Sequence, residues 1–261
     1  MAAHEDVAVV AENGCSALAN FACSSAGLQA AIDAGALAAI VAAMVLHKDV
    51  AKVAENGCWA IGIIANYIGC EQAAVDAGAP AVIVSAISAH KDVAKIVEYG
   101  CRALINITYC SGYSAGGKKA AVDAGAPAAI VATMAAHKDV AEIAGNGCLA
   151  LANIAHYFGG EQAAVDAGAT AAIVAAMAAH KDVADVAENG CRALGSITET
   201  PAGQQAAVNA GAPAAIVAAK AAHKDHVSVA EYGSEALINI SLLVPAGKQA
   251  VIDAQSRRAK A

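Results

Sequence analysis

Aromatic side chains and positive charge are both scarce in this sequence. Phe, Trp and Tyr make up only 3% of the 261 residues, and Trp occurs once. The core must therefore consist of Ala, Val, Ile and Leu, whose small side chains each bury little area at about 25 cal/mol per Å². The formal net charge is −7. Such a charge argues against a nucleic-acid partner, which needs basic surfaces, and favours a basic protein partner.

Recognisable catalytic and metal-binding motifs are also missing. We find no CxxC pair, no Cys/His zinc spacing, no phosphate-binding loop and no nucleophile beside a base. The repeated histidines occur one per repeat, too far apart to share an ion. We therefore expect a non-enzymatic protein with no cofactor and no metal.

Long apolar runs and a leader are lacking as well. The longest runs, such as 36–46, are too short to span a bilayer, and the start MAAHEDVAVV does not follow the pattern of a signal peptide. Five of the eight cysteines hold one repeated position, where helices roughly 8–10 Å apart would keep them from pairing. Reduced thiols predict a cytoplasmic location, with the nucleus or an organelle interior as alternatives. The five are Cys15, Cys58, Cys101, Cys148 and Cys191.

One stretch is present six times. HKDVAKVAENGCWAIGIIA begins at His47, and related stretches begin at His4, His90, His137, His180 and His223. Their starts are 43 residues apart, except for 47 between His90 and His137. A fixed period in this range predicts an all-α solenoid that forms a single domain over residues 1–261. Its units are approximately 1–27, 28–70, 71–117, 118–160, 161–203, 204–246 and a partial 247–261.

Each complete unit is expected to contain a short first helix, a second helix and a long third helix. Glycines such as Gly168 end the first helix, and prolines such as Pro80 begin the second. His180 closes a second helix, and Asp182 is expected to cap the following third helix. A glycine such as Gly190 inside each third helix costs about 1 kcal/mol against alanine. We expect a neighbouring helix backbone to approach closely there.

These residues resemble the armadillo repeat. The resemblance rests on the helix order, on QAAVDAGATAAIVAAM (162–177) and on third helices that end like ALANIA (150–155). HEAT repeats, the structural alternative, lack the short first helix. The Ala-rich regularity also fits an idealised or consensus-derived sequence. The resemblance implies a right-handed α-solenoid whose third helices line a concave groove for an extended peptide.

The resemblance also implies where a guest would bind. Nuclear-import members of the family carry a Trp and an Asn four residues apart, with an acidic residue three before the Trp. Here the Asn position is largely kept, whereas the Trp position holds Trp only at Trp59. A nuclear-import-type adaptor for basic signals is therefore the weaker alternative.

Comparison between the repeats singles out the Trp position. It holds Ser, Trp, Arg, Leu, Arg and Glu in turn, a range that a core position does not tolerate, so it faces outward. Simple solvent exposure is one interpretation. Contact with a partner is the other, because Trp, Tyr and Arg are the usual hot-spot residues and Asn suits a peptide backbone. The candidate binding residues are Asn13, Asn20, Asn56, Trp59, Tyr99, Arg102, Asn106, Asn146, Leu149, Asn153, Asn189, Arg192, Tyr232, Glu235 and Asn239.

Two further features of the sequence could contact a partner. A repeated acidic position, at Glu12, Glu55, Glu98, Glu188 and Glu231, is either a solvated face or a rail that attracts basic residues of a partner. The main functional alternative is an architectural subunit of a larger assembly. It would use the 107–119 loop and its uncapped ends, with end-to-end contact to another chain.

Overall fold

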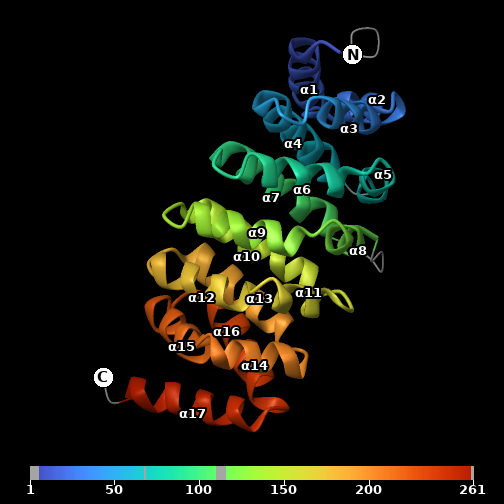
Figure 1. Cartoon of the computed structure of the whole chain (residues 1–261). Coiled ribbons are helices and arrows are strands. Elements are labelled where there is room, and N and C mark those ends of the chain that lie inside the picture. The colour runs from blue at the N-terminus through green and yellow to red at the C-terminus, as the bar shows by residue number, and fades with distance from the viewer. Residues whose placement is uncertain (1–5, 68, 110–115, 260–261) are drawn as a thin grey trace. The chain divides into compact units, whose positions relative to one another are not determined.

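The computed structural model describes residues 6–67, 69–109 and 116–259. Within these residues the chain is all-α, with 17 helices and no strand (Figure 1). It forms two compact units, residues 1–129 and 130–261. The expected loop at 107–119 is shorter in its described part, because residues 107–108 end α7 and residues 116–119 begin α8. Residues 110–115 of that loop, and His4, lie outside the described part.

Unit 1, residues 1–129, repeats a pattern of short, medium and long helices. The short first helices are α2 (Ser25–Asp33), α5 (Glu71–Asp76) and α8 (Gly116–Asp123). The second helices are α3 (Ala36–Leu46), α6 (Ala79–Ala89) and α9 (Ala126–Ala136), of which the last crosses the unit boundary. The third helices are α1 (Ala8–Ala22), α4 (Ala51–Ala65) and α7 (Ala94–Thr108).

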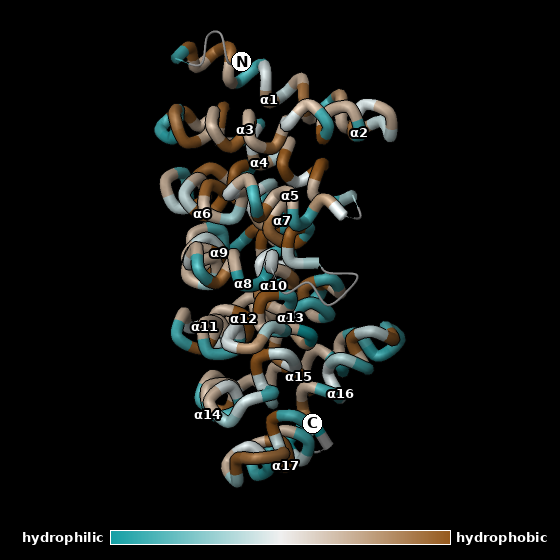
Figure 2. The backbone as a smooth tube through the Cα atoms, turned by 90° about the vertical axis from the view of Figure 1, so that its right-hand side faces the viewer, coloured by the Kyte–Doolittle hydropathy of each residue, from teal (hydrophilic) through white to brown (hydrophobic). Residues whose placement is uncertain are grey.

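Unit 2, residues 130–261, continues the same pattern. Its first helices are α11 (Gly160–Asp166) and α14 (Pro201–Asn209), and its second helices are α12 (Ala169–Ala179) and α15 (Ala212–Ala222). Its third helices are α10 (Ala141–Ala155), α13 (Ala184–Ile197) and α16 (Val227–Leu242). The final helix, α17 (Pro245–Ala259), packs against α14, α15 and α16 and mixes hydrophobic and hydrophilic residues along its length (Figure 2).

The turn between the first and second helices depends on glycine, as predicted. Gly168 has φ +75° and its N–H donates to the carbonyl of Val165 at 2.9 Å. Residues other than glycine rarely adopt this left-handed backbone conformation, so glycine ends the first helix with little strain. The helices on either side bend by 71° at this turn. Pro80 occupies the first turn of α6, as expected.

The turn between the second and third helices corrects one prediction. Asp182 is not the cap of α13, because the N-cap is Val183 in an extended conformation without a side-chain cap bond. The turn is closed instead by the Val183 N–H, which donates to the carbonyl of His180 at 2.9 Å. The His180 ring also reaches the previous repeat, where its Nε2 lies 2.9 Å from the carbonyl oxygen of Lys138.

The glycine inside each third helix has a different cause from the one expected. A Cβ on Gly100 would lie 2.6 Å from Cγ1 of Ile87, and one on Gly190 would lie 2.7 Å from Cγ of Met177. Both neighbours are long side chains of the preceding second helix. The expectation that a helix backbone approaches there is therefore wrong. The glycines of α4, α7, α10 and α13 instead admit a large apolar side chain of their own repeat, which fills the core, and Gly233 of α16 admits the stem of Lys220.

Each unit has its own core of branched aliphatic side chains. In unit 1 the largest fully buried side chains include Ile40, Ile61, Ile64, Ile83, Ile87, Ile96, Leu104 and Ile107. In unit 2 they include Ile130, Ile143, Leu151 and Ile154. Among the described residues no single helix is long and apolar enough to cross a membrane. The bent pairs α2–α3 and α11–α12 reach that length and apolarity only together.

Candidate functional site

The third helices of each unit lie side by side. In unit 1, α4 packs against both α1 and α7, and in unit 2, α13 packs against both α10 and α16. Small residues line these contacts. A Cβ on Gly62 of α4 would lie 3.6 Å from Cα of Ala103 in α7, which is ordinary van der Waals contact. Residues at equivalent positions on adjacent helices are thereby brought close together.

We call the surface formed by the candidate positions the third-helix face. In unit 1 it comprises Asn13, Ser16, Asn20, Asn56, Trp59, Ile63, Tyr99, Arg102 and Asn106. In unit 2 it comprises Asn146, Leu149, Asn153, Asn189, Arg192, Ser196, Tyr232, Glu235 and Asn239. At the Trp position, which varies most between the repeats, no side chain is buried. Arg102 and Glu235 are exposed, and Ser16, Trp59, Leu149 and Arg192 are half-buried.

In unit 1 the face carries an aromatic pair. The rings of Trp59 on α4 and Tyr99 on α7 are stacked, with centroids 6.2 Å apart and planes inclined by 28°. The Lys95 ammonium lies 5.5 Å from the Tyr99 ring centroid. Offset aromatic pairs and cation–π contacts of this kind each contribute about 0.5–1.5 kcal/mol. The two rings therefore form a partly pre-ordered apolar platform, with the exposed Arg102 on the same helix.

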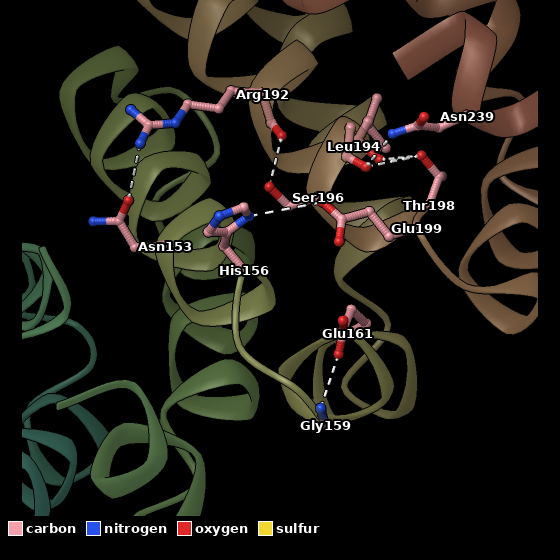
Figure 3. A network of polar contacts seen from close by, with 11 residues as sticks. Asn153, His156, Gly159, Glu161, Arg192, Leu194, Ser196, Thr198, Glu199 and Asn239 are labelled. Carbon is pink, nitrogen blue, oxygen red and sulfur yellow. Dashed lines mark hydrogen bonds and ion pairs between the residues drawn. The ribbon is translucent and has the colours of Figure 1, made fainter. Parts of the chain in front are cut away.

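In unit 2 a cation takes the central place. The Arg192 guanidinium lies 5.9 Å from the Tyr232 ring centroid. Its Nη2 donates to Oδ1 of Asn153 at 3.3 Å (Figure 3). Arg192 thus connects α10, α13 and α16. Because the tyrosine and asparagine hold the guanidinium in place, less side-chain entropy is lost when it binds a further acceptor.

Two of these asparagines, Asn106 and Asn239, join neighbouring helices, a role that the sequence pattern did not indicate. Asn106 Nδ2 donates to the carbonyl of Gly62 at 2.8 Å, and Asn239 Nδ2 donates to the carbonyl of Gly195 at 3.1 Å. Each bond crosses from one third helix to the previous one. Asn153 is only 4% exposed, so it faces a guest far less than the other asparagines.

One asparagine of the second row, Asn56, behaves in the same way. Asn56 Nδ2 donates to the carbonyl of Glu12 at 3.2 Å, again crossing to the preceding helix. A primary amide has two N–H groups and a carbonyl oxygen, so one crossing bond leaves further capacity for a guest. The residues expected to bind a peptide therefore also fasten the helices that carry them.

The repeated acidic position is partly neutralised within its own helices. Glu55 accepts from Lys52 at 2.8 Å, and Glu98 accepts from Lys95 at 2.8 Å. The pKa of Lys52 is raised, first by its hydrogen bond to Glu55 and then by the charge of that carboxylate. These pairs reduce the negative charge that a continuous acidic rail would need.

The repeated cysteines form the inner side of the third helices. Cys15, Cys58, Cys101, Cys148 and Cys191 are fully buried and free, and burial raises the pKa of each thiol. A buried neutral thiol is a poor nucleophile and a poor metal ligand. Within the described residues, no group of three or more His, Cys, Asp or Glu is placed to hold a metal ion.

Each unit also has an apolar hollow between its second helices. In unit 1 a hollow of about 380 Å³ lies between α3 and α6, with Val45, Lys48 and Ser85 in its lining. The equivalent hollow of unit 2, between α9 and α12, is about 140 Å³. It is lined at equivalent positions by Ala135, Lys138 and Ala175, so hollows at equivalent places in the two units differ in size.

Comparison with known proteins gives a likeness of fold. No protein-family profile and no curated protein matches this sequence. A crystal structure of an engineered protein is similar with a TM-score of 0.75 and 26% identity, over 90% of this chain and 92% of the other. A second engineered protein has a TM-score of 0.59 and 24% identity, over 95% of this chain and 69% of the other. The all-α arrangement of this chain is thus shared with engineered proteins.

Proposed function

We propose that this chain is a non-catalytic interaction scaffold that holds an extended peptide or partner segment along the third-helix face. The proposal includes the finer architecture, a right-handed α-solenoid of armadillo type in which that face is concave. The main support for the proposal is that aromatic and cationic side chains lie in contact across neighbouring third helices whose sequences are otherwise similar. Trp59 pairs with Tyr99, and Arg192 pairs with Tyr232.

The spacing of the helices suits an extended chain. Packed helices lie 8–10 Å apart, so three third helices span roughly 20 Å. An extended peptide advances about 3.3 Å per residue, and roughly six residues would cover one unit. The crossing asparagines retain an N–H and an acceptor oxygen for main-chain groups, which every peptide offers. Selectivity would then come from the variable side chains between them.

The charge of the guest follows from the charge of the chain. The net charge of −7 favours basic segments at long range. Close to the face, Arg102 and Arg192 instead favour a carboxylate at their own positions. We therefore expect a guest that is basic overall and has an apolar or aromatic residue opposite the Trp59–Tyr99 pair.

A displayed library of random 12-residue peptides tests this proposal. The full chain is immobilised, enriched peptides are synthesised with a fluorophore, and binding is measured by anisotropy. Trp59→Ala combined with Arg102→Ala should weaken binding at least tenfold, because truncation of each hot-spot residue costs more than about 1 kcal/mol. Arg102 is exposed and Trp59 is half-buried, so the melting temperature should fall only slightly, through the loss of the Trp59–Tyr99 stack.

The matched control removes an aromatic and a cation elsewhere. Phe158→Ala with Lys224→Ala leaves the third-helix face intact, since Phe158 lies 94% exposed beyond the end of α10 and Lys224 follows α15. The control should bind the selected peptides like the wild type. Failure to enrich any peptide over an unrelated helical protein would refute the proposal. Equal affinities of the wild type and of the face variant would do so too.

A further inference from the structure

The first third helix exposes a position that is buried in its counterparts. Ala17 of α1 is exposed, whereas Ala60, Ala103, Ala193 and Ala236 are all fully buried. In α7 and α16 these alanines face the previous third helix: Ala103 lies against Gly62, and Ala236 against Gly195. The exposed surface of α1 around Ala17 therefore carries the residues with which α7 and α16 pack against another third helix. We call it the head face.

The last third helix exposes the complementary position. Ile238 of α16 is 58% exposed, whereas four of its counterparts, Ala19, Gly62, Ala152 and Gly195, are buried and the fifth, Ile105, is half-buried. Leu242, one turn further along, is 65% exposed. The helix α17 packs on α16 and leaves both side chains open. We call the surface around Ile238 and Leu242 the tail face.

The hydrogen bonds show the same difference between α1 and two other third helices, α7 and α16. Asn106 and Asn239 each donate across to the carbonyl that is equivalent to that of Ile238, at 2.8 and 3.1 Å. Asn20 occupies the same position in α1, but its Nδ2 turns back to the carbonyl of Ser16 in its own helix at 2.9 Å. The amide that elsewhere joins two third helices is thus present on the head face and is engaged only locally.

We propose that the head face of one copy of this chain seats on the tail face of a second copy. In that contact Ala17 packs against Ile238, and Asn20 Nδ2 donates to the carbonyl of Ile238. The arrangement repeats the α13–α16 contact, in which Ala236 packs near Gly195 and Asn239 bonds its carbonyl. The two faces differ, so the contact is heterologous, and a pair of copies retains one open head face and one open tail face. Copies therefore add head to tail, into a ring or an open fibre.

Sedimentation velocity of the full chain tests this directly. The contact is made mainly by one third helix from each copy, so the buried interface is expected to be small and the association weak. We expect the weight-average mass to rise continuously as the concentration is increased from about 5 µM toward about 500 µM. The buffer should contain about 0.3 M NaCl, which screens the repulsion between chains of net charge −7.

Two surface variants isolate the contact. Ala17→Arg blocks the head face and Ile238→Lys blocks the tail face, and both positions are exposed, so folding should be unchanged. Each variant alone should remain monomeric. Mixed in equal amounts they should form a one-to-one dimer, because the first keeps an intact tail and the second an intact head. Ala171→Arg, at an exposed position of α12, is the control and should assemble like the wild type.

The outcomes are distinguishable. A wild-type chain that stays monomeric throughout the concentration range overturns the proposal. Assembly by either variant alone also overturns it, because that result requires another interface. A mixture of the two variants that remains monomeric shows that the head and tail faces do not bind each other. Circular dichroism confirms that each variant is helical, so a loss of assembly is not mistaken for unfolding.

Discussion

Raising the pH from 7 to 10 should destabilise this protein through the buried thiols of its third helices. Burial raises the pKa of Cys15 from 9.0 to about 11 and that of Cys101, Cys148 and Cys191 to about 12. The pKa of Cys58 rises as well, first by burial and then by its neighbours Cys101 and Cys15. At pH 10 the folded protein therefore keeps these thiols protonated, whereas the unfolded chain ionises them.

The direction and size of the effect follow from this difference. The unfolded state binds fewer protons above pH 9, so stability is complete below that pH and falls as the pH rises toward 11–12. At pH 10 each thiol costs about 1.4 kcal/mol, because the unfolded state gains a factor of about ten from ionisation. The five thiols together cost about 7 kcal/mol. With an m-value near 3 kcal/mol per M, the urea midpoint should fall by about 2 M.

The measurement is urea unfolding followed by far-UV circular dichroism at pH 7, 9 and 10, with a non-thiol reductant. A variant with alanine at all five positions is the control. Lysines and tyrosines titrate equally in both proteins, so the difference between the two midpoint shifts isolates the thiols. The variant should lose far less stability between pH 7 and 10 than the wild type. Equal midpoint shifts would refute the assignment of alkaline lability to buried cysteine.

Further predictions concern helix packing, and thermal melting measures them all. Gly100→Ala should cost about 1–3 kcal/mol, because the added methyl overlaps a branched side chain of the second helix. Gly195→Ala should instead stabilise by up to about 1 kcal/mol, because its methyl meets only ordinary contacts and alanine favours a helix. If both substitutions changed the stability in the same direction, that result would contradict this packing. Asn239→Ala should cost about 0.5–1.5 kcal/mol by removing a bond between helices. Asn20→Ala, which removes only a bond within an exposed helix, should cost less, and a cost as large as that of Asn239→Ala would count against the helix-joining role.

The local features of the fold could be predicted from the sequence. Gly168 marks the end of a first helix because the left-handed conformation is a property of that residue and its immediate neighbours. The 43-residue period likewise predicts that a first, a second and a third helix follow one another in each unit. Asp182 shows the limit of such reasoning. Its side chain is a suitable cap, but a main-chain bond from the next residue to His180 already closes the turn.

The contacts of the candidate site could not be predicted in this way. Asn106 donates to a carbonyl 44 residues earlier, and Trp59 stacks on a ring 40 residues later in the chain. Both contacts depend on how closely two third helices approach. The same applies to Gly100, whose neighbour Ile87 lies on another helix. The exposure of the variable position could be inferred because the repeats serve as copies of one another, whereas its partners could not.

The histidine rings at three turns have a consequence for how the repeats are joined. Nε2 lies 2.9 Å from a main-chain carbonyl of the previous repeat at His90, His180 and His223. A carbonyl oxygen can only accept, so Nε2 must carry the hydrogen, and the contact selects one of the two neutral ring tautomers. The histidine that closes each of these second helices therefore also ties its repeat to the one before.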